Sequence, residues 1–317
     1  NVGLNDVSVE ALAISYGDRR FALDSYQRLI QKYGEVVCGI SKDVFDHETD
    51  SILSRSNISD SSLMSEEALE ELIREFKRVF QDQTGESFIQ DPRVQLRNCL
   101  IAVFESWNIK RAQTYRRMQG ISDDLGTAAS VVAMVFGNLG SESGTGVCFT
   151  RNPSTGEPGL FGEFLLSAQG EDVVSGIRTP EPVAVMGDLM PRAFDELQQH
   201  AVTLESYNRD MQDIEFTVER GDLHILQTRN GKRTVRAAVK IAVDLVKEGL
   251  ISEDEAILRV DPDDLAQLLM PQLADDHGMD IAAVGLGASP GAATGFIALD
   301  ADIAEQRAAK GEQVILV

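Results

Sequence analysis

The sequence predicts an α+β protein, with helices in its first third, short strands in its middle and further helices behind them. Three observations support this fold class. Apolar residues recur at helical spacing over 65–84, apolar runs bounded by glycine fill 130–168, and polar and apolar residues alternate over 211–219. The 317 residues are enough for two domains, and 43% of them are hydrophobic, as in ordinary globular proteins.

Helices are expected in the first third of the chain. Ser65 and Gly85 suit the two ends of one helix, and Asp91 followed by Pro92 suits the start of the next. The apolar face of the first of these helices consists of Leu69, Leu72, Ile73, Phe76 and Phe80. Both helices are interpreted as structural elements.

Strands are expected in the middle of the chain. The runs SVVAMVFG (130–137), GVCFTRN (146–152) and GEFLLSA (162–168) are short, apolar and bounded by glycine. A helix is expected over 191–208, and the segment 211–232 resembles a β-hairpin.

Helices return after the hairpin. The segment 233–249 is amphipathic, and Ser252 with Glu255 forms a capping-box pattern. A short helix is expected to begin at Asp261, and the apolar segment 311–317 is expected to be a strand.

Composition excludes several classes of function. The formal net charge of −22 opposes nucleic-acid binding, which needs concentrated Lys and Arg. No apolar run approaches the roughly 20 residues of a membrane span, and no signal peptide is recognisable. Cys38, Cys99 and Cys148 are scattered without a zinc-binding pattern, so a reducing, cytoplasmic location is expected.

The hairpin contains the most informative pattern. Ile214, Phe216 and Val218 are expected to share a buried face, which leaves Asp213 and Glu215 on the other. Two carboxylates on one face repel each other unless a cation joins them, and Mg²⁺ is a hard cation that carboxylates bind.

The turn decides which residues of the second strand join these carboxylates. A three-residue loop around Gly221 places Gln227 and Arg229 on the face of the carboxylates, and His224 on the face of Ile214. A two-residue loop would move Arg229 to the apolar face, where a charge is costly. The polar face is either a solvated outer surface or a site for Mg²⁺ and a nucleoside triphosphate, in which Arg229 meets phosphate oxygens.

A glycine-rich segment, GNLGSESGTGVCFTRNPSTGE, covers 137–157. Alone it is compatible with a hairpin that has a loose loop. Glycine also allows backbone N–H groups to approach a ligand closely, as in anion-binding nests. It is not a Walker A loop, because no Gly-Lys-Ser/Thr follows.

Several segments together resemble the pyruvate, phosphate dikinase family of phosphoenolpyruvate-utilising enzymes. These are GLNDVSVEALA, FESWNIKRAQTYRRM, FGNLGSESGTGVCFTRNPSTGE, GEFLLSAQGEDVVSGIRTPEPV, QDIEFTVERGDLHILQTRNGKRT and GLGASPGAATG. The resemblance covers essentially the whole chain. A phosphoenolpyruvate synthase is the alternative, but its segment ends in Ala-Arg-Pro where this chain has Thr228-Arg229-Asn230.

The resemblance implies a domain organisation. Residues 1–232 would form an ATP-grasp-like nucleotide-binding domain, truncated at its N-terminus, with a helical insertion over about 7–90. Linker helices would follow over 233–276, and 277–317 would begin a phosphohistidine swivelling domain, left incomplete.

The resemblance also implies an activity for the whole enzyme. ATP, phosphate and pyruvate would become AMP, pyrophosphate and phosphoenolpyruvate, with a histidine of the swivelling domain carrying the phosphoryl group to a TIM-barrel domain. The whole enzyme would be a cytoplasmic homodimer. Because the carrier histidine and the pyruvate site would lie outside these residues, overall turnover is not expected from this chain. Ser130 and Val132 stand where the family usually has Asn and Gln, which together with the missing termini makes a diverged, non-catalytic nucleotide-binding module a second alternative.

Site residues follow from the resemblance one by one. Those expected at ATP are Thr145, Gly146, Asp213, Glu215, Gln227 and Arg229. Asp213 and Glu215 would also bind Mg²⁺, and Thr145 with Gly146 would belong to the glycine loop over the phosphates. No catalytic residue is assigned. Glu171 and Arg178 are weaker candidates with an equal expectation of a structural role.

Overall fold

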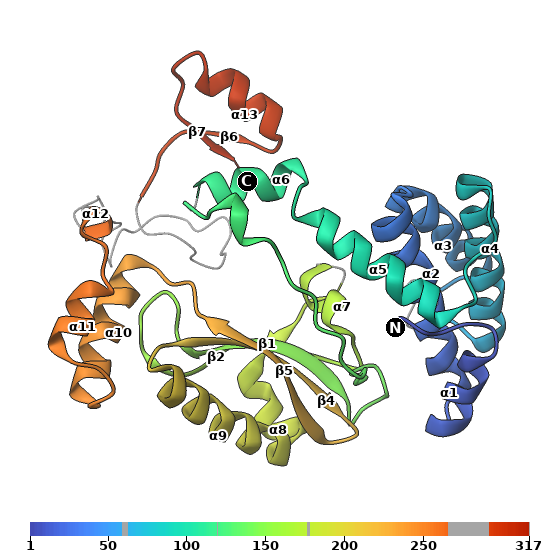
Figure 1. The fold of residues 1–317 in the computed structure, drawn as a ribbon, viewed down its shortest axis with the longest axis horizontal. Coiled ribbons are helices and arrows are strands. Elements are labelled where there is room, and N and C mark those ends of the chain that lie inside the picture. Colours follow the sequence, from blue (N-terminus) through green and yellow to red (C-terminus); the bar gives the residue numbers. More distant parts are fainter. Residues whose placement is uncertain (59–62, 119, 176–177, 266–291, 317) are drawn as a thin grey trace. The chain divides into compact units, whose positions relative to one another are not determined.

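The computed structural model describes residues 1–58, 63–118, 120–175, 178–265 and 292–316. These residues form an α+β protein (Figure 1), as the sequence predicts. By their internal contacts they divide into two compact units, Asn1–Met134 and Val135–Val317. The domain boundaries that the resemblance implies, at residues 232 and 276, stay predictions.

The first unit is helical. Its helices are α1 (Ser8–Tyr16), α2 (Arg19–Cys38), α3 (Lys42–Ser56), α4 (Glu66–Thr84), α5 (Pro92–Ser106) and α6 (Lys110–Met118). The expected ends of α4 are confirmed: the Ser65 hydroxyl accepts a hydrogen bond from the Ala68 N–H, and Gly85 follows with a φ of 77°. The start of α5 at Asp91 and Pro92 is confirmed as well.

Aromatic side chains from several helices fill the core of this unit. Phe45 of α3 and Phe76 of α4 meet edge to face, with their ring centroids 5.0 Å apart. Tyr33 of α2 contacts Phe80 and Phe88, which also contact each other. A 3₁₀ turn, Asp123–Leu125, follows α6.

The strand predicted over 130–137 is wrong. Those residues form no strand in the structure, and Val131 and Val132 are exposed. The apolar run therefore has no strand partner among the described residues, so its composition alone does not produce a strand.

The second unit contains an antiparallel five-stranded sheet of order β3-β2-β1-β4-β5. Its strands are β1 (Gly144–Arg151), β2 (Pro158–Leu166), β3 (Glu181–Pro182), β4 (Gln212–Glu219) and β5 (Asp222–Asn230). Helix α7 (Gly170–Ser175) and a 3₁₀ turn (Val183–Val185) lie in the connection between β2 and the helices that follow.

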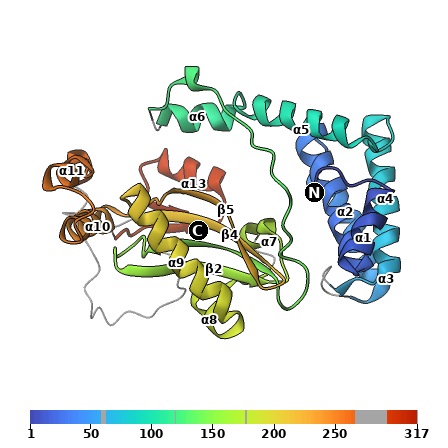
Figure 2. The same ribbon diagram turned by 60° about the horizontal axis from the view of Figure 1, so that its bottom comes forward.

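Helices α8 (Met186–Leu189) and α9 (Pro191–Asn208) cover one face of this sheet (Figures 1 and 2). The bounds of α9 agree with the prediction. Ile214, Phe216 and Val218 are fully buried under these helices, and Leu197 of α9 packs among them. The opposite face of the sheet therefore carries the polar residues of β4.

The β4–β5 hairpin has the expected strand pairing, but its turn is shorter than expected and one strand contains a bulge. Its turn has only two residues, Arg220 and Gly221, with φ values of 51° and 84°. A bulge at Leu226 then shifts the register, so that Glu215 pairs with Gln227. The expected three-residue loop is wrong, but the shared polar face is correct, because the bulge supplies the extra residue.

The same two-residue turn corrects the position of His224. Before the bulge His224 pairs with Thr217. Cross-strand partners point to the same face, so His224 lies on the polar face and not on the face of Ile214.

The chain continues into α10 (Val235–Lys247), α11 (Glu253–Leu258) and α12 (Pro262–Leu265). The capping box of Ser252 and Glu255 is confirmed. Residues 266–291, which include most of the expected linker and the GLGASPG motif, lie outside the described residues.

A small unit of β6 (Phe296–Ala298), α13 (Ala301–Ala308) and β7 (Val314–Leu316) ends the described chain. Its two strands pair in parallel, which agrees with the strand expected at 311–317.

Among the described residues, every helix is too short or too polar to cross a bilayer. All three cysteines are free thiols. Burial raises the pKa of the Cys148 thiol to about 12, and the nearby Asp213 charge adds to this effect.

Candidate functional site

The face of the sheet opposite α8 and α9, which we call the open face, brings four of the predicted site residues together. Asp213 and Glu215 project from β4, and their cross-strand partners on β5 are Arg229 and Gln227. Because partners share a face and alternate residues of a strand do too, the four side chains form one polar cluster. We call this cluster the hairpin site.

Arg229 holds the two carboxylates of the hairpin site together. Its Nε donates to Asp213 Oδ2 at 2.7 Å, and its Nη2 lies 3.5 Å from Glu215 Oε1. The hydrogen bond to Asp213 raises the pKa of the guanidinium. The cation that the spacing of Asp213 and Glu215 requires is therefore, in this structure, an arginine of the same hairpin.

Exposure differs across the hairpin site. The Asp213 side chain is 12% exposed, Glu215 38% and Arg229 57%. Asp213 is thus fixed in the sheet, whereas Arg229 reaches into solvent on the edge strand β5. Arg229 can change its partner at lower cost than Asp213 can.

The structure places Thr145 and Gly146 differently from expectation. Both lie inside β1, not in the glycine-rich loop. The Thr145 hydroxyl donates to the Phe216 carbonyl at 3.0 Å and contacts the Thr217 hydroxyl at 3.2 Å. The pairing of Thr145 with Thr217 puts it on the face of the hairpin site, two strand positions from Glu215, or about 7 Å.

Close packing explains why position 146 is glycine. A Cβ there would lie 2.6 Å from both the Glu163 carbonyl oxygen and the Phe216 ring. The backbone of Gly146 is also paired with strands on both sides. A contact between these two residues and a nucleotide stays a prediction.

The glycine-rich loop before β1 meets the tip of the hairpin. Gly221 N–H donates to the Glu142 carbonyl at 2.8 Å, and Arg220 N–H donates to the Ser143 hydroxyl at 2.9 Å. The loop therefore lies at the tip end of the sheet, while Asp213 lies near its open end. About 13 Å of strand separates Thr217 from Asp213 at 3.3 Å per residue.

The two weaker candidates lie beyond β2. Arg178 donates to the carbonyls of Leu166 and Ser167 at 2.9 and 3.1 Å, a structural role that ties the following loop to the end of β2. Glu171 lies in the first turn of α7.

An apolar cavity of about 420 Å³ borders the hairpin site. Val147 and Phe149 line it, and they are the β1 partners of Glu215 and Asp213. The rest of its wall includes Phe161, Glu163, Pro182 and Ala184. The open face is therefore charged on one side and mainly apolar on the other.

Sequence reasoning missed a buried ion network behind the open end of the hairpin. Arg151, 2% exposed, donates to Glu205 at 2.6 and 2.9 Å and to Glu248 at 2.6 Å. Burial disfavours its charge, but the two carboxylates outweigh this effect and raise the pKa of Arg151. An arginine after the apolar run GVCFT was the only signal in the sequence.

Comparison with known proteins finds similarity to one family of enzymes. Residues 87–192 match the family described as "Pyruvate phosphate dikinase, AMP/ATP-binding domain". That range ends before the hairpin, but full-length matches include it. The chain is 50% identical to a pyruvate, phosphate dikinase of Rhizobium meliloti and 48% identical to one of Clostridium symbiosum, each match covering 100% of this chain and 37% of the relative.

A chloroplastic pyruvate, phosphate dikinase of Mesembryanthemum crystallinum is 48% identical, over 100% of this chain and 34% of the relative. The chain thus spans little more than a third of the length of the curated relatives it matches. The chain is similar over its whole length to part of the pyruvate, phosphate dikinases, and its residues 87–192 match the AMP/ATP-binding domain of that family.

Proposed function

We propose that the chain binds Mg·ATP on the open face of its five-stranded sheet, at the hairpin site. The observation that carries this proposal is the register that brings Asp213, Glu215, Gln227 and Arg229 onto one face. A ligand with phosphate groups and an aromatic ring suits a face that is charged beside an apolar cavity. ATP-grasp-like architecture, with Thr145 and Gly146 near the phosphates, is part of the proposal.

The donor set fits a hard divalent cation. Asp213 and Glu215 offer carboxylate oxygens, the ligands that Mg²⁺ prefers, and Mg²⁺ commonly combines one or two carboxylates with substrate phosphates. The described residues contain no cluster of three or more acidic, His or Cys side chains placed for a metal, so phosphate oxygens would complete the set. A bound Mg²⁺ would neutralise charge on those phosphates.

Arg229 would exchange partners when the nucleotide binds. It now occupies the space between the two carboxylates, where it competes with a metal ion. Phosphate oxygens offer its guanidinium an equivalent bidentate acceptor. In the proposed complex Asp213 and Glu215 hold the metal and Arg229 holds phosphate.

The exchange predicts opposite effects of Arg229→Gln on two ligands. Binding of Mn²⁺ alone, measured by electron paramagnetic resonance, should become several-fold tighter because the competing cation is gone. Binding of Mg·ATP, measured by calorimetry, should weaken about thirtyfold, since a charge-assisted contact of about 2 kcal/mol is lost.

Arg192→Gln is the matched control, because Arg192 pairs with Asp222 at the hairpin tip and its side chain is 74% exposed. It makes the same change in net charge and should leave both affinities unchanged. Equal Mn²⁺ binding by Arg229→Gln and the wild-type chain would rule out the competition.

For the whole protein we propose the dikinase reaction, in which ATP, phosphate and pyruvate become AMP, pyrophosphate and phosphoenolpyruvate. Its relatives are dikinases, which are phosphotransferases, and they favour this activity over the phosphoenolpyruvate synthase alternative. Phosphohistidine and TIM-barrel domains, a homodimer and a cytoplasmic location belong to the same proposal. The free cysteines support a reducing compartment.

A further inference from the structure

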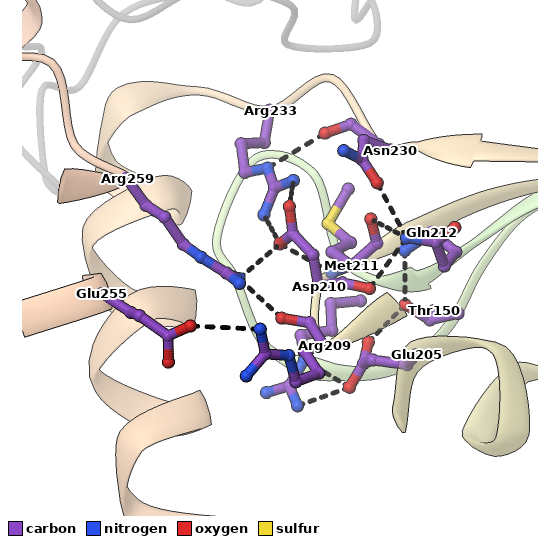
Figure 3. A network of polar contacts seen from close by, with 12 residues as sticks. Thr150, Glu205, Arg209, Asp210, Met211, Gln212, Asn230, Arg233, Glu255 and Arg259 are labelled. Atoms are coloured by element: carbon purple, nitrogen blue, oxygen red, sulfur yellow. Dashed lines mark hydrogen bonds and ion pairs between the residues drawn. The ribbon is translucent and has the colours of Figure 1, made fainter. Parts of the chain in front are cut away.

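The open end of the β4–β5 hairpin is closed by a pair of partly buried charges (Figure 3). Asp210 precedes β4 and Arg233 follows β5, and their side chains are 17% and 15% exposed. Arg233 Nη1 and Nη2 donate to the two carboxylate oxygens of Asp210 at 2.6 and 2.9 Å. Arg233 Nε also donates to the Gly231 carbonyl at 2.9 Å. One side chain thus joins the chain entering β4 to the chain leaving β5.

Gln212 completes this closure. Its Nε2 donates to Asn230 Oδ1 at 3.1 Å, and its Oε1 accepts from the Thr228 hydroxyl at 3.0 Å. The pair of Gln212 and Asn230 is the register neighbour of Asp213 and Arg229. The hairpin site therefore begins one residue inside the closed end.

Helix α11 binds to the same segment (Figure 3). Arg259, at its C-terminal cap, donates to the Arg209 carbonyl at 2.6 Å and lies 3.7 Å from Asp210 Oδ1. Glu255 pairs with the Arg209 guanidinium at 3.1 Å. The turn before β4 is thus held from two sides, by Arg233 and by the helix that follows α10.

Edge position makes this closure important for the site. Within the described part of the chain, β5 is the last strand of the sheet and pairs only with β4, and its residues from Leu226 to Asn230 are exposed. The end of such a strand opens locally at low cost unless something holds it. Opening from this end would separate Arg229 from Asp213 first and Gln227 from Glu215 next.

We propose that Arg233 is a positioning residue for the hairpin site. Through Asp210 it keeps the open end of the hairpin closed and thereby fixes Arg229 and Gln227 opposite Asp213 and Glu215. Arg259 supports the same carboxylate from α11, so the helix after the nucleotide-binding sheet contributes to the geometry of the site. The link to nucleotide binding rests on the function proposed above, whereas the closure of the hairpin does not.

Hydrogen exchange tests the closure without any ligand. In Arg233→Gln we expect amides of 226–231 to exchange about tenfold faster than in the wild-type chain, which corresponds to about 1.4 kcal/mol. Amides of 144–149 in β1 should keep their wild-type rates. Arg259→Gln should act in the same direction with about a threefold effect, because its contact with Asp210 is longer.

Calorimetry with Mg·ATP then tests the effect on the site. We expect the affinity of Arg233→Gln to fall about tenfold, and Arg233→Lys, which keeps the charge but not the bidentate contact, to lie between it and the wild-type chain. Arg192→Gln, in α9, where Arg192 pairs with Asp222 at the opposite end of the hairpin, should change neither exchange nor affinity. If Arg233→Gln does not fold, both hydrogen exchange and Mg·ATP affinity are measured on Arg233→Lys instead.

The outcomes separate the two proposals. Unchanged exchange at 226–231, or exchange that rises equally in β1, would overturn the positioning role. Faster exchange at 226–231 with wild-type affinity for Mg·ATP would overturn its link to the site. A wild-type chain that does not bind Mg·ATP would instead contradict the proposed function, and the exchange result would still decide whether Arg233 closes the hairpin.

Discussion

Replacing Glu215 by glutamine is expected to weaken Mg·ATP binding about thirtyfold while leaving the unfolding temperature nearly unchanged. The variant keeps the shape of the side chain but removes one negative charge from a hard-cation site, and contacts of charged groups contribute about 1.5–3 kcal/mol. Because the side chain is 38% exposed and lies 3.5 Å from Arg229, its charge adds little to folding. Calorimetric titration and a thermal melt measure both quantities.

Asp222→Asn is the matched control for this variant. Asp222 lies in the same hairpin, loses the same charge and pairs only with the exposed Arg192 among the ion pairs of the described residues. Its affinity for Mg·ATP should equal that of the wild-type chain. Wild-type affinity in Glu215→Gln would leave the polar face of the hairpin as a solvated surface.

The second large effect concerns stability. Arg151→Met is expected to lower the free energy of unfolding by about 3–5 kcal/mol, because it removes the buried cation and leaves the partly buried Glu205 carboxylate without its partner. Glu205 is 13% exposed in its side chain, so water reaches it poorly. Urea unfolding followed by circular dichroism measures the loss as a lower midpoint.

Two variants make this result interpretable. Arg192→Met removes an arginine from exposed ion pairs and should cost less than about 1 kcal/mol. Adding Glu205→Gln to Arg151→Met removes the isolated charge and should restore part of the loss. A cost below about 1 kcal/mol for Arg151→Met would show that the network is not a major source of stability.

Local rules of sequence predicted most of the elements correctly. The capping residues Ser65, Asp91 and Ser252 correctly predicted where helices start. A cap needs only a side-chain acceptor within three residues of a free backbone N–H, so it can be recognised from the local sequence. Alternation over β4 predicted both faces of that strand, since side chains of a strand alternate whatever lies around it.

Features that depend on distant residues were not predictable in this way. The bulge at Leu226 restores a register that the two-residue turn would otherwise shift. The run over 130–137 is apolar, but it can form a strand only if a second strand pairs with it, and the local sequence does not show whether such a strand exists. Arg151 meets Glu248, 97 positions away, and no local pattern connects them.

The glycine-rich stretch shows the same limit in the site itself. The sequence predicts that Gly146 lies in a loop over the phosphates. In the structure it lies within β1 and packs closely against Phe216. Phe216 is 70 positions away in sequence, so the need for a small residue there was invisible beforehand. The pairing of Asp213 with Arg229 was predictable because both belong to one hairpin.

The most direct test of Mg·ATP binding at the hairpin site is a crystal structure of the chain with Mn²⁺ and a non-hydrolysable ATP analogue, with the metal located by its anomalous signal. We predict a metal peak within coordination distance of the carboxylates of both Asp213 and Glu215, and Arg229 turned from Asp213 to a phosphate oxygen. A nucleotide bound elsewhere, with Arg229 still hydrogen-bonded to Asp213, would contradict Mg·ATP binding at the hairpin site.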